Sequence, residues 1–270
     1  MSDESRPSPA EMSTETAAGT AAGMAAGTRA NIRTAAVIPA AGRGVRLGPG
    51  APKALRALGG TPMLIHAVRA MAASRRVSLV VVVAPPDGAA EVKSLLDAHA
   101  LPEWTDFLVV PGGGSRQESV RLGLDALPDE YDVVLVHDAA RPLVPVDTVD
   151  TVIEAVREGA PAVVPALPLA DTVKQVEPAA VPGEPEPVVA TPERARLRAV
   201  QTPQGFDRGT LVRAHGTVTD NVTDDASMVE QLGLTVVVVP GHEEAFKVTR
   251  PLDLVLAEAV LARRRLNDGF

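Results

Sequence analysis

The segment Thr34-Ala35-Ala36-Val37-Ile38-Pro39 is apolar, and it runs directly into a turn of small residues that begins with Ala40-Ala41-Gly42. Aliphatic residues in an unbroken run predict a strand that is buried on both faces. Small residues after a strand let the backbone approach a ligand closely, and consecutive backbone amides then form a site for an anion. This segment therefore predicts a buried strand that ends at a phosphate-binding turn.

The same alternation continues along the chain. The predicted strands are 79–83, 107–110, 133–136, 162–164 and 235–239, and the predicted helices are 64–71, 92–98, 115–127, 146–157, 225–232 and 252–265. Apolar strands that alternate with amphipathic helices indicate an α/β fold with a Rossmann-like, mostly parallel sheet that is covered on both faces. Ligands bind such sheets beyond the carboxyl ends of the strands, so we expect the chemistry to follow Ile38, Val110 and Val136.

The composition limits the classes of function. Hydrophobic residues make up 46% of the chain and aromatic residues only 2%, which predicts a core of Val, Leu, Ala and Ile. The net charge of -8 argues against general nucleic-acid binding, which needs a basic surface. The absence of cysteine excludes disulfides and thiolate metal sites. No apolar run predicts a membrane span or a secretory signal, and we expect a cytoplasmic protein.

Two segments depart from the α/β pattern. Residues 1–31 are rich in Ala, Gly, Ser, Thr and Pro and have no hydrophobic period, which predicts a disordered tail before one domain at 32–270. Between Asp171 and Arg194, repeated prolines exclude a helix, and valines at 173, 176, 188 and 189 are candidates for two strands of an extended hairpin. This segment is either a long surface loop or a protruding β-arm at about 171–194.

Two cations follow the first turn. Arg46 and Lys53 place positive charge beside the predicted anion site. The glycine spacing is that of neither a dinucleotide-binding turn nor a GxxxxGK[ST] loop, so both are disfavoured. The alternative is a flexible surface loop with two solvated cations.

Two further groups of polar residues allow two interpretations each. Asp138 ends a buried strand, where a carboxylate needs a cation or hydrogen bonds, so it binds Mg²⁺ or pairs with Arg141. Its neighbour His137 is interpreted as structural. Asp224 and Asp225 are adjacent carboxylates that suggest either a metal ligand pair or the start of a helix, and we rank the helix cap first.

Five further motifs follow the first turn in order. They are Val136-His137-Asp138-Ala139-Ala140-Arg141-Pro142, Asp171-Thr172-Val173-Lys174, Gln201-Thr202-Pro203-Gln204, Thr223-Asp224-Asp225-Ala226-Ser227 and Phe246-Lys247-Val248-Thr249. With the first turn and Lys53, this ordered set resembles the 2-C-methyl-D-erythritol 4-phosphate cytidylyltransferase family of the non-mevalonate isoprenoid pathway. The resemblance covers roughly Thr34 to the C-terminus. It implies a nucleotidyltransferase-type fold. It also implies an enzyme that transfers CMP from CTP to 2-C-methyl-D-erythritol 4-phosphate and releases pyrophosphate.

The resemblance also implies roles for single residues. The implied catalytic residues are Arg46 and Lys53, which stabilise charge on the α-phosphate, and Arg194 and Lys247, which hold the substrate phosphate. The implied nucleotide-binding residues are Ala40, Ala41, Gly42, Gly112, Gly113, Ser119, Asp138 and Ala139. The implied substrate-binding residues are Arg141, Thr172, Thr202 and Thr223. Asp138 is also the expected ligand of Mg²⁺, which is the expected cofactor.

The resemblance further implies a homodimer. In the family the arm reaches into a partner subunit, so Thr172 and Arg194 would complete the neighbour's site. Within Pro111 to Ser119, the Ser119 hydroxyl and the loop backbone are expected to recognise cytosine, while Ser115 is also a candidate helix cap.

Three rival functions remain at this point. A ribitol-5-phosphate cytidylyltransferase shares the same general plan, and its substrate differs by little more than hydroxyl and methyl placement. A uridylyl- or molybdopterin-type transferase is disfavoured by the motifs around Asp138 and Thr202. A nucleotide sensor or binding module of the same fold would not need both Arg46 and Lys53 at the α-phosphate, and this chain has both.

Overall fold

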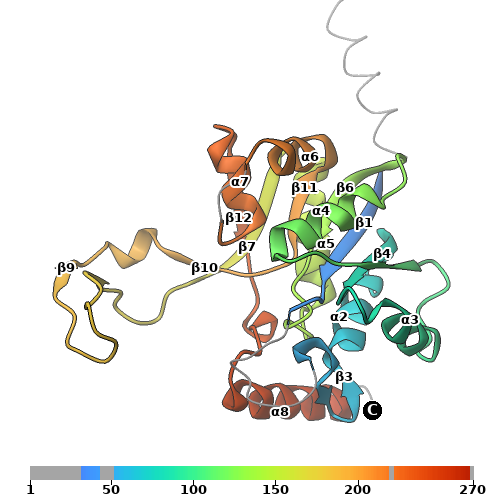
Figure 1. The fold of residues 1–270 in the computed structure, drawn as a ribbon, viewed down its shortest axis with the longest axis horizontal. Coiled ribbons are helices and arrows are strands. Elements are labelled where there is room, and N and C mark those ends of the chain that lie inside the picture. The colour runs from blue at the N-terminus through green and yellow to red at the C-terminus, as the bar shows by residue number, and fades with distance from the viewer. Residues whose placement is uncertain (1–31, 43–51, 219–221, 268–270) are drawn as a thin grey trace, which may run out of the picture. The chain divides into compact units, whose positions relative to one another are not determined.

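The computed structural model describes residues 32–42, 52–218 and 222–267 (Figure 1). Its strands are β1 (Arg33–Pro39), β2 (Ala57–Leu58), β3 (Thr61–Pro62), β4 (Val77–Ala84), β5 (Asp106–Pro111), β6 (Tyr131–Val136), β7 (Ala162–Pro168), β8 (Gln175–Val176), β9 (Val188–Ala190), β10 (Arg198–Val200), β11 (Gln204–Asp207) and β12 (Val236–Pro240). Its α-helices are α2 (Met63–Ala72), α3 (Ala89–Asp97), α4 (Arg116–Asp125), α5 (Val146–Arg157), α6 (Arg208–Thr217), α7 (Asp225–Gln231) and α8 (Pro251–Asn267). The predicted tail, residues 1–31, lies outside the described residues.

The central sheet has the strand order β10-β7-β11-β6-β1-β4-β5, and β12 pairs with β7. The pairs β1–β4, β1–β6, β4–β5 and β7–β12 are parallel, whereas β10 and β11 run antiparallel to their neighbours. β1 is central and buried from Thr34 to Ile38, as its apolar sequence predicts. The predicted α/β fold with a mostly parallel sheet is confirmed.

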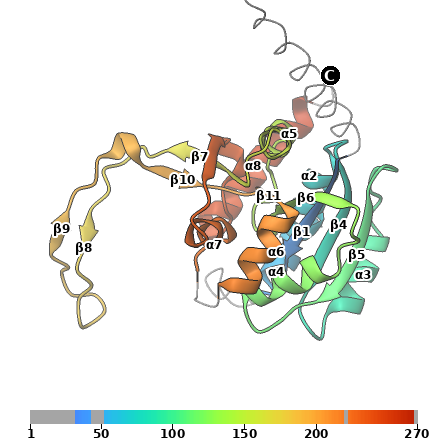
Figure 2. The ribbon, with the colours of Figure 1, turned by 90° about the horizontal axis from the view of Figure 1, so that it is seen from above.

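Helices cover both faces of the sheet (Figure 2). α2 and α5 contact each other and pack on β4, β6 and β7, while α4 and α6 contact each other and pack on β1, β4, β6 and β11. Helix α5 begins after Pro145 and buries Val149, Val152, Ile153 and Val156, the spacing of one helical face. Among the described helices, none combines the length and the apolar character needed to cross a membrane.

The segment between β7 and β10 forms an arm that projects away from the sheet (Figures 1 and 2). Its strands β8 and β9 form a separate antiparallel pair, in which Gln175 lies opposite Ala190 and Val176 opposite Val188. The hairpin prediction is right at Val176, Val188 and Val189 but wrong at Val173, which precedes β8. In this register Val173 would lie opposite Pro192, which has no backbone N–H to pair with it.

Three elements of the central sheet and its covering helices were not predicted: β10, β11 and α6. β11 contains Gly205, where a Cβ atom would lie 2.5 Å from Val152 Cγ1 of α5, so packing against α5 selects the glycine and breaks the strand pattern. Helix α6 contains Gly209 and Gly216, which lower its helix propensity. Its start carried a usable signal, because Asp207 caps it by accepting the Thr210 N–H at 2.8 Å.

We expect Gly123→Ala to destabilise the protein by about 1–3 kcal/mol, because its new methyl group would overpack the core. A Cβ atom at Gly123 of α4 would lie 2.6 Å from Val37 Cγ1 and 2.9 Å from Val83 Cγ2. Urea unfolding measures the change. The matched control is Gly216→Ala in α6, where nothing lies within 4 Å of the new atom. A Gly123→Ala protein as stable as this control would contradict close packing of α4 on β1.

Candidate active site

A cavity of about 640 Å³ opens at the carboxyl ends of β1 and β6. It is the position that a mostly parallel sheet predicts for a ligand. The sequence-predicted residues that line it are Ala40, Ala41, Gly42, Lys53, Gly113, Ser119, Asp138, Ala139 and Lys247. The fold therefore brings residues from both ends of the domain into one site.

The first wall of the cavity consists of two backbone segments in close contact. The Ala40 N–H donates to Val83 O and the Gly112 N–H donates to Ala84 O, both at 2.8 Å, so the turn after β1 and the loop after β5 extend the sheet. A Cβ atom at Gly112 would lie 2.9 Å from both Ala41 Cβ and Ala84 O. Glycine is therefore needed at 112 for the two segments to meet, although Gly112 itself does not line the cavity.

The second wall is the loop that enters α4. Ser115 caps the helix by accepting the Glu118 N–H at 3.0 Å, so the predicted cap is confirmed. The Ser119 hydroxyl accepts the Gly113 N–H at 3.2 Å and donates to Ser115 O at 2.8 Å. Ser119 thus shapes the loop through its hydroxyl, and it also lines the cavity, while its contact with cytosine stays a prediction.

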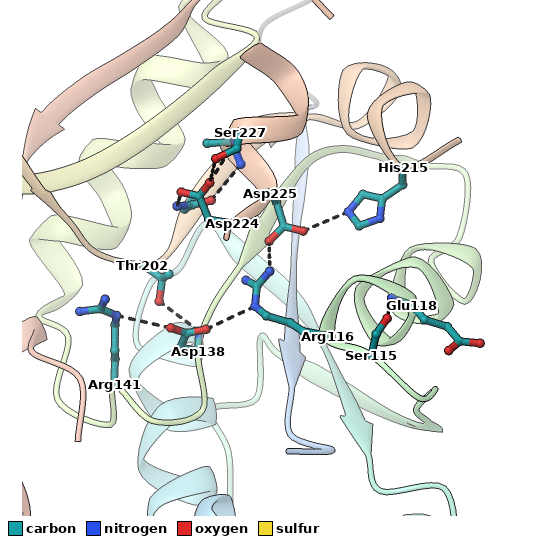
Figure 3. A network of polar contacts seen from close by, with 12 residues as sticks. Ser115, Arg116, Glu118, Asp138, Arg141, Thr202, His215, Asp224, Asp225 and Ser227 are labelled. Atoms are coloured by element: carbon teal, nitrogen blue, oxygen red, sulfur yellow. Dashed lines mark hydrogen bonds and ion pairs between the residues drawn. The ribbon is translucent and has the colours of Figure 1, made fainter. Parts of the chain in front are cut away.

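Asp138 is the charged centre of the site (Figure 3). Its side chain is only 12% exposed, with Lys247 Nζ at 2.7 Å and Arg141 Nε at 3.7 Å from Oδ2, and Arg116 Nε at 3.8 Å from Oδ1. Burial alone would raise the pKa of Asp138, but Lys247, Arg116 and Arg141 outweigh it and lower the pKa to about 2. The carboxylate is therefore ionised at neutral pH.

A buried hydrogen-bond chain holds the backbone of Asp138. His137 Nε2 lies 3.1 Å from Arg141 O, which only accepts, so we assign the proton to Nε2. His137 Nδ1 then accepts from the Thr202 hydroxyl at 3.0 Å, and the Thr202 oxygen accepts the Asp138 N–H at 3.0 Å. Burial lowers the pKa of His137 to about 4, which keeps the ring neutral. His137 is structural, as the sequence suggested.

Lys247 reaches Asp138 because its neighbours belong to a small second core. Val248 is fully buried and donates its N–H to Ala140 O at 2.8 Å, and Phe246 packs against the same cluster as Val248. Leu58, Met63, Leu143 and Ala257 complete that cluster. Lys247 also borders a second cavity of about 540 Å³ beside α8. On the other side of the site, Lys53 opens the short 3-10 helix η3 (Lys53–Leu55), where Ala54 is buried.

Several predicted site residues lie elsewhere. Thr202 is buried behind Asp138 and does not line the cavity. Arg141 also lies outside the lining, where it donates to Ala245 O at 2.7 Å and Val200 O at 3.3 Å. Thr172 and Thr223 are not part of the lining, and neither is Arg194, which begins the 3-10 helix η4 (Arg194–Arg196) and donates to Ala170 O. Arg46 lies outside the described residues.

The sequence did not identify Arg116 as a site residue, and it did not predict that Asp225 is buried. Arg116 lines the cavity, and its Nη1 lies 2.7 Å from Asp225 Oδ2. Asp224 caps α7 by accepting the Ser227 N–H at 3.0 Å, which confirms the predicted cap. Asp225, its neighbour, is instead fully buried. The usable signal for Arg116 was a cation at the start of a helix that follows a Gly-rich loop.

The residues present fit a magnesium ion only as part of a larger ligand set. Within the described ranges, no group of three or more His, Cys, Asp or Glu side chains is placed to hold a metal. Asp138 supplies one ionised carboxylate at the cavity. One carboxylate would be enough if phosphate oxygens and water supplied the remaining ligands.

A small-residue turn, a buried carboxylate and two lysines at the carboxyl edge of this sheet define a nucleotide-dependent transferase of the nucleotidyltransferase type. The family described as "IspD: 2-C-methyl-D-erythritol 4-phosphate cytidylyltransferase" matches residues 34–263. The chain belongs to this family. It is accordingly a nucleotidyltransferase of isoprenoid precursor biosynthesis, and its reaction converts CTP and 2-C-methyl-D-erythritol 4-phosphate to 4-diphosphocytidyl-2-C-methyl-D-erythritol and pyrophosphate.

Known relatives agree with this assignment. The 2-C-methyl-D-erythritol 4-phosphate cytidylyltransferase of Streptomyces coelicolor is 89% identical over 270 residues, which is 100% of both chains. The protein of the same name from Frankia casuarinae is 55% identical over 87% of this chain and 83% of its own. The crystal structure of the enzyme of that name from Thermus thermophilus has a TM-score of 0.65 at 35% identity, covering 85% of this chain and 98% of the other.

We expect the free energy of unfolding to fall as the pH is lowered from 6.5 towards 4. His137 has an ordinary pKa of 6.5 and a folded pKa of about 4, so in this range the unfolded chain binds a proton that the folded protein excludes. The loss for this one group approaches about 3 kcal/mol at the lower end. Urea titrations at several pH values, compared with His137→Asn, measure it. The variant should be less stable at pH 7.5 but less pH-dependent, and parallel curves would contradict a buried neutral ring.

Proposed function

We propose that the cavity at the ends of β1 and β6 holds CTP while the phosphate of 2-C-methyl-D-erythritol 4-phosphate attacks the α-phosphorus. The supporting observation is the meeting of Lys53, Asp138 and Lys247 in one cavity with the small-residue turn after β1. Backbone amides and cations suit a triphosphate, and they act best where charge develops in the transition state.

The proposed reaction is an in-line displacement. An oxygen of the methylerythritol phosphate forms a bond to the α-phosphorus, the bond from that phosphorus to the β-phosphate oxygen breaks, and pyrophosphate leaves with the electron pair. Lys53, with Arg46, is proposed to stabilise the charge on the α-phosphate. Lys247 is proposed to orient the attacking phosphate, which needs no general base because it is already anionic near neutral pH.

We further propose Mg²⁺ as the cofactor. Asp138 is the residue that would hold it, because its carboxylate lines the cavity and stays ionised. When bound, the ion would neutralise charge on the triphosphate oxygens. We also infer a cytoplasmic location, since a chain without cysteine loses no disulfide in a reducing compartment.

The arm supports a proposed homodimer. Every residue from Ala180 to Thr191 is exposed, including Val181, Val188 and Val189, which are each more than half exposed. Thr172 and Arg194 lie on this arm and not in the cavity of their own chain. We propose that they complete the site of a second subunit, which would give two shared sites related by twofold symmetry.

We expect Lys53→Ala to lower kcat/KM for pyrophosphate release from CTP and methylerythritol phosphate by about 100-fold or more, the typical cost of removing one transition-state charge partner. CTP binding, followed by calorimetry, should persist. The matched control is Lys93→Ala, an exposed lysine of α3 that pairs with Asp97. Turnover near that of the wild type would contradict the proposed role of Lys53. Release with ribitol 5-phosphate in place of methylerythritol phosphate would contradict the substrate assignment.

We expect mixed dimers of Lys53→Ala and Arg194→Ala chains to recover activity that neither variant has alone. In a random equal mixture, half of the dimers are mixed and each carries one intact site, so about one quarter of wild-type activity should return. Size-exclusion chromatography with differently tagged chains verifies mixing. Verified mixed dimers without recovered turnover would contradict sites shared between subunits.

A further inference from the structure

A row of polar side chains runs from helix α6 to Asp138 (Figure 3). His215 Nε2 of α6 lies 3.0 Å from Asp225 Oδ1, Arg116 Nη1 of α4 lies 2.7 Å from Asp225 Oδ2, and Arg116 Nε lies 3.8 Å from Asp138 Oδ1. Arg116 is far in sequence from the helices that contribute His215 and Asp225. None of the roles assigned so far uses Arg116, Asp225 or His215.

Asp225 lies in the middle of this row, between His215 and Arg116. Its side chain has no exposed surface, and the side chain of His215 is only 2% exposed. Burial alone would raise the pKa of Asp225, but the hydrogen bond from His215 and the charge of Arg116 outweigh it and lower the pKa. Its Oδ1 pairs with His215 Nε2, and its Oδ2 forms an ion pair with Arg116 Nη1, so the charge of Asp225 restrains the Arg116 guanidinium on one side.

Arg116 faces two carboxylates at once. One edge of its guanidinium meets the buried Asp225, and Nε faces Asp138, which lines the same cavity as Arg116. On the other side of Asp138, Lys247 approaches Oδ2. The two oxygens of Asp138 therefore lie between Arg116 on one side and Lys247 and Arg141 on the other.

We propose that Arg116 is a positioning residue of the reaction: held by Asp225 and His215, it sets the direction in which the Asp138 carboxylate faces the nucleotide. This inference rests on the proposed function, because it acts through the nucleotide-binding role of Asp138. The planar guanidinium suits the task, since its fork of donors can address two carboxylates in a fixed geometry.

The substitution Arg116→Lys separates this role from simple charge compensation. A lysine ammonium is a single charged point, so it can still pair with the buried Asp225 but cannot also hold Asp138. We expect the variant to unfold cooperatively near the wild-type midpoint. We expect its dissociation constant for CTP to rise, and its kcat/KM for CTP to fall, by about tenfold. KM for methylerythritol phosphate should change by less than about twofold.

A double-mutant cycle tests whether Arg116 acts through Asp138. In an Asp138→Asn background, Arg116→Lys should weaken CTP binding no further, because the group that it positions is already lost. Asp225→Asn provides a second route, since it loosens the guanidinium without touching the cavity, and it should weaken CTP binding only when Asp138 is present. The matched control is Arg121→Lys on the same helix, whose exposed arginine pairs with Asp125.

Two results would overturn the inference. One is a folded Arg116→Lys protein with wild-type CTP binding and kinetics, which would make Arg116 a structural link only. The other is an Arg116→Lys effect of full size in the Asp138→Asn background, which would make Arg116 independent of Asp138. Either result can occur while Lys53→Ala lowers turnover as expected, whereas failure of the proposed function would appear as wild-type turnover in Lys53→Ala itself.

Discussion

A carboxylate that is almost buried stays charged only with nearby cations or hydrogen-bond donors, and at Asp138 cations meet this requirement. Three cations satisfy it, and each comes from a different part of the chain: Arg116 from α4, Arg141 from the loop after β6, and Lys247 from the segment before α8. The sheet places Asp138 at its carboxyl edge, and the second core around Val248 places Lys247 opposite. The electrostatics of one residue thus link the packing of several elements.

The backbone segments around the site are closely packed and hydrogen-bonded to one another. Gly112 brings the loop after β5 against the turn after β1, and Ser119 closes the loop with two hydrogen bonds. His137 and Thr202 hold the Asp138 N–H from behind while remaining uncharged. Neutral hydrogen bonds therefore fix the position of the main chain, and charged groups fix the side chain. This division leaves the cavity side of Asp138 for a ligand.

Much of this arrangement follows from local sequence. β1, β4, β6 and α5 could be predicted because uninterrupted aliphatic runs and helical spacing are properties of the segments themselves. β11 and α6 could not be predicted, since their glycines interrupt the local pattern. In β11 a glycine is required because Val152, which is distant in sequence, packs against it. In the site, Lys53, Asp138 and Lys247 followed from motifs, whereas the partnership of Arg116 with Asp225 depends on how α4 and α7 meet. Pairing between such distant segments leaves no local pattern.

Strand β10, which follows the arm, leads directly to the residue that supports Asp138. β10 ends at Val200, the Gln201 N–H donates to Pro165 O at 2.8 Å, and the Thr202 oxygen accepts the Asp138 N–H. Arg141 adds a second connection through Val200 O. Thr202, which accepts the Asp138 N–H, thus lies only two residues beyond the end of β10. The arm and the residue that supports Asp138 are therefore close in the chain, so a displacement of β10 would also displace Thr202.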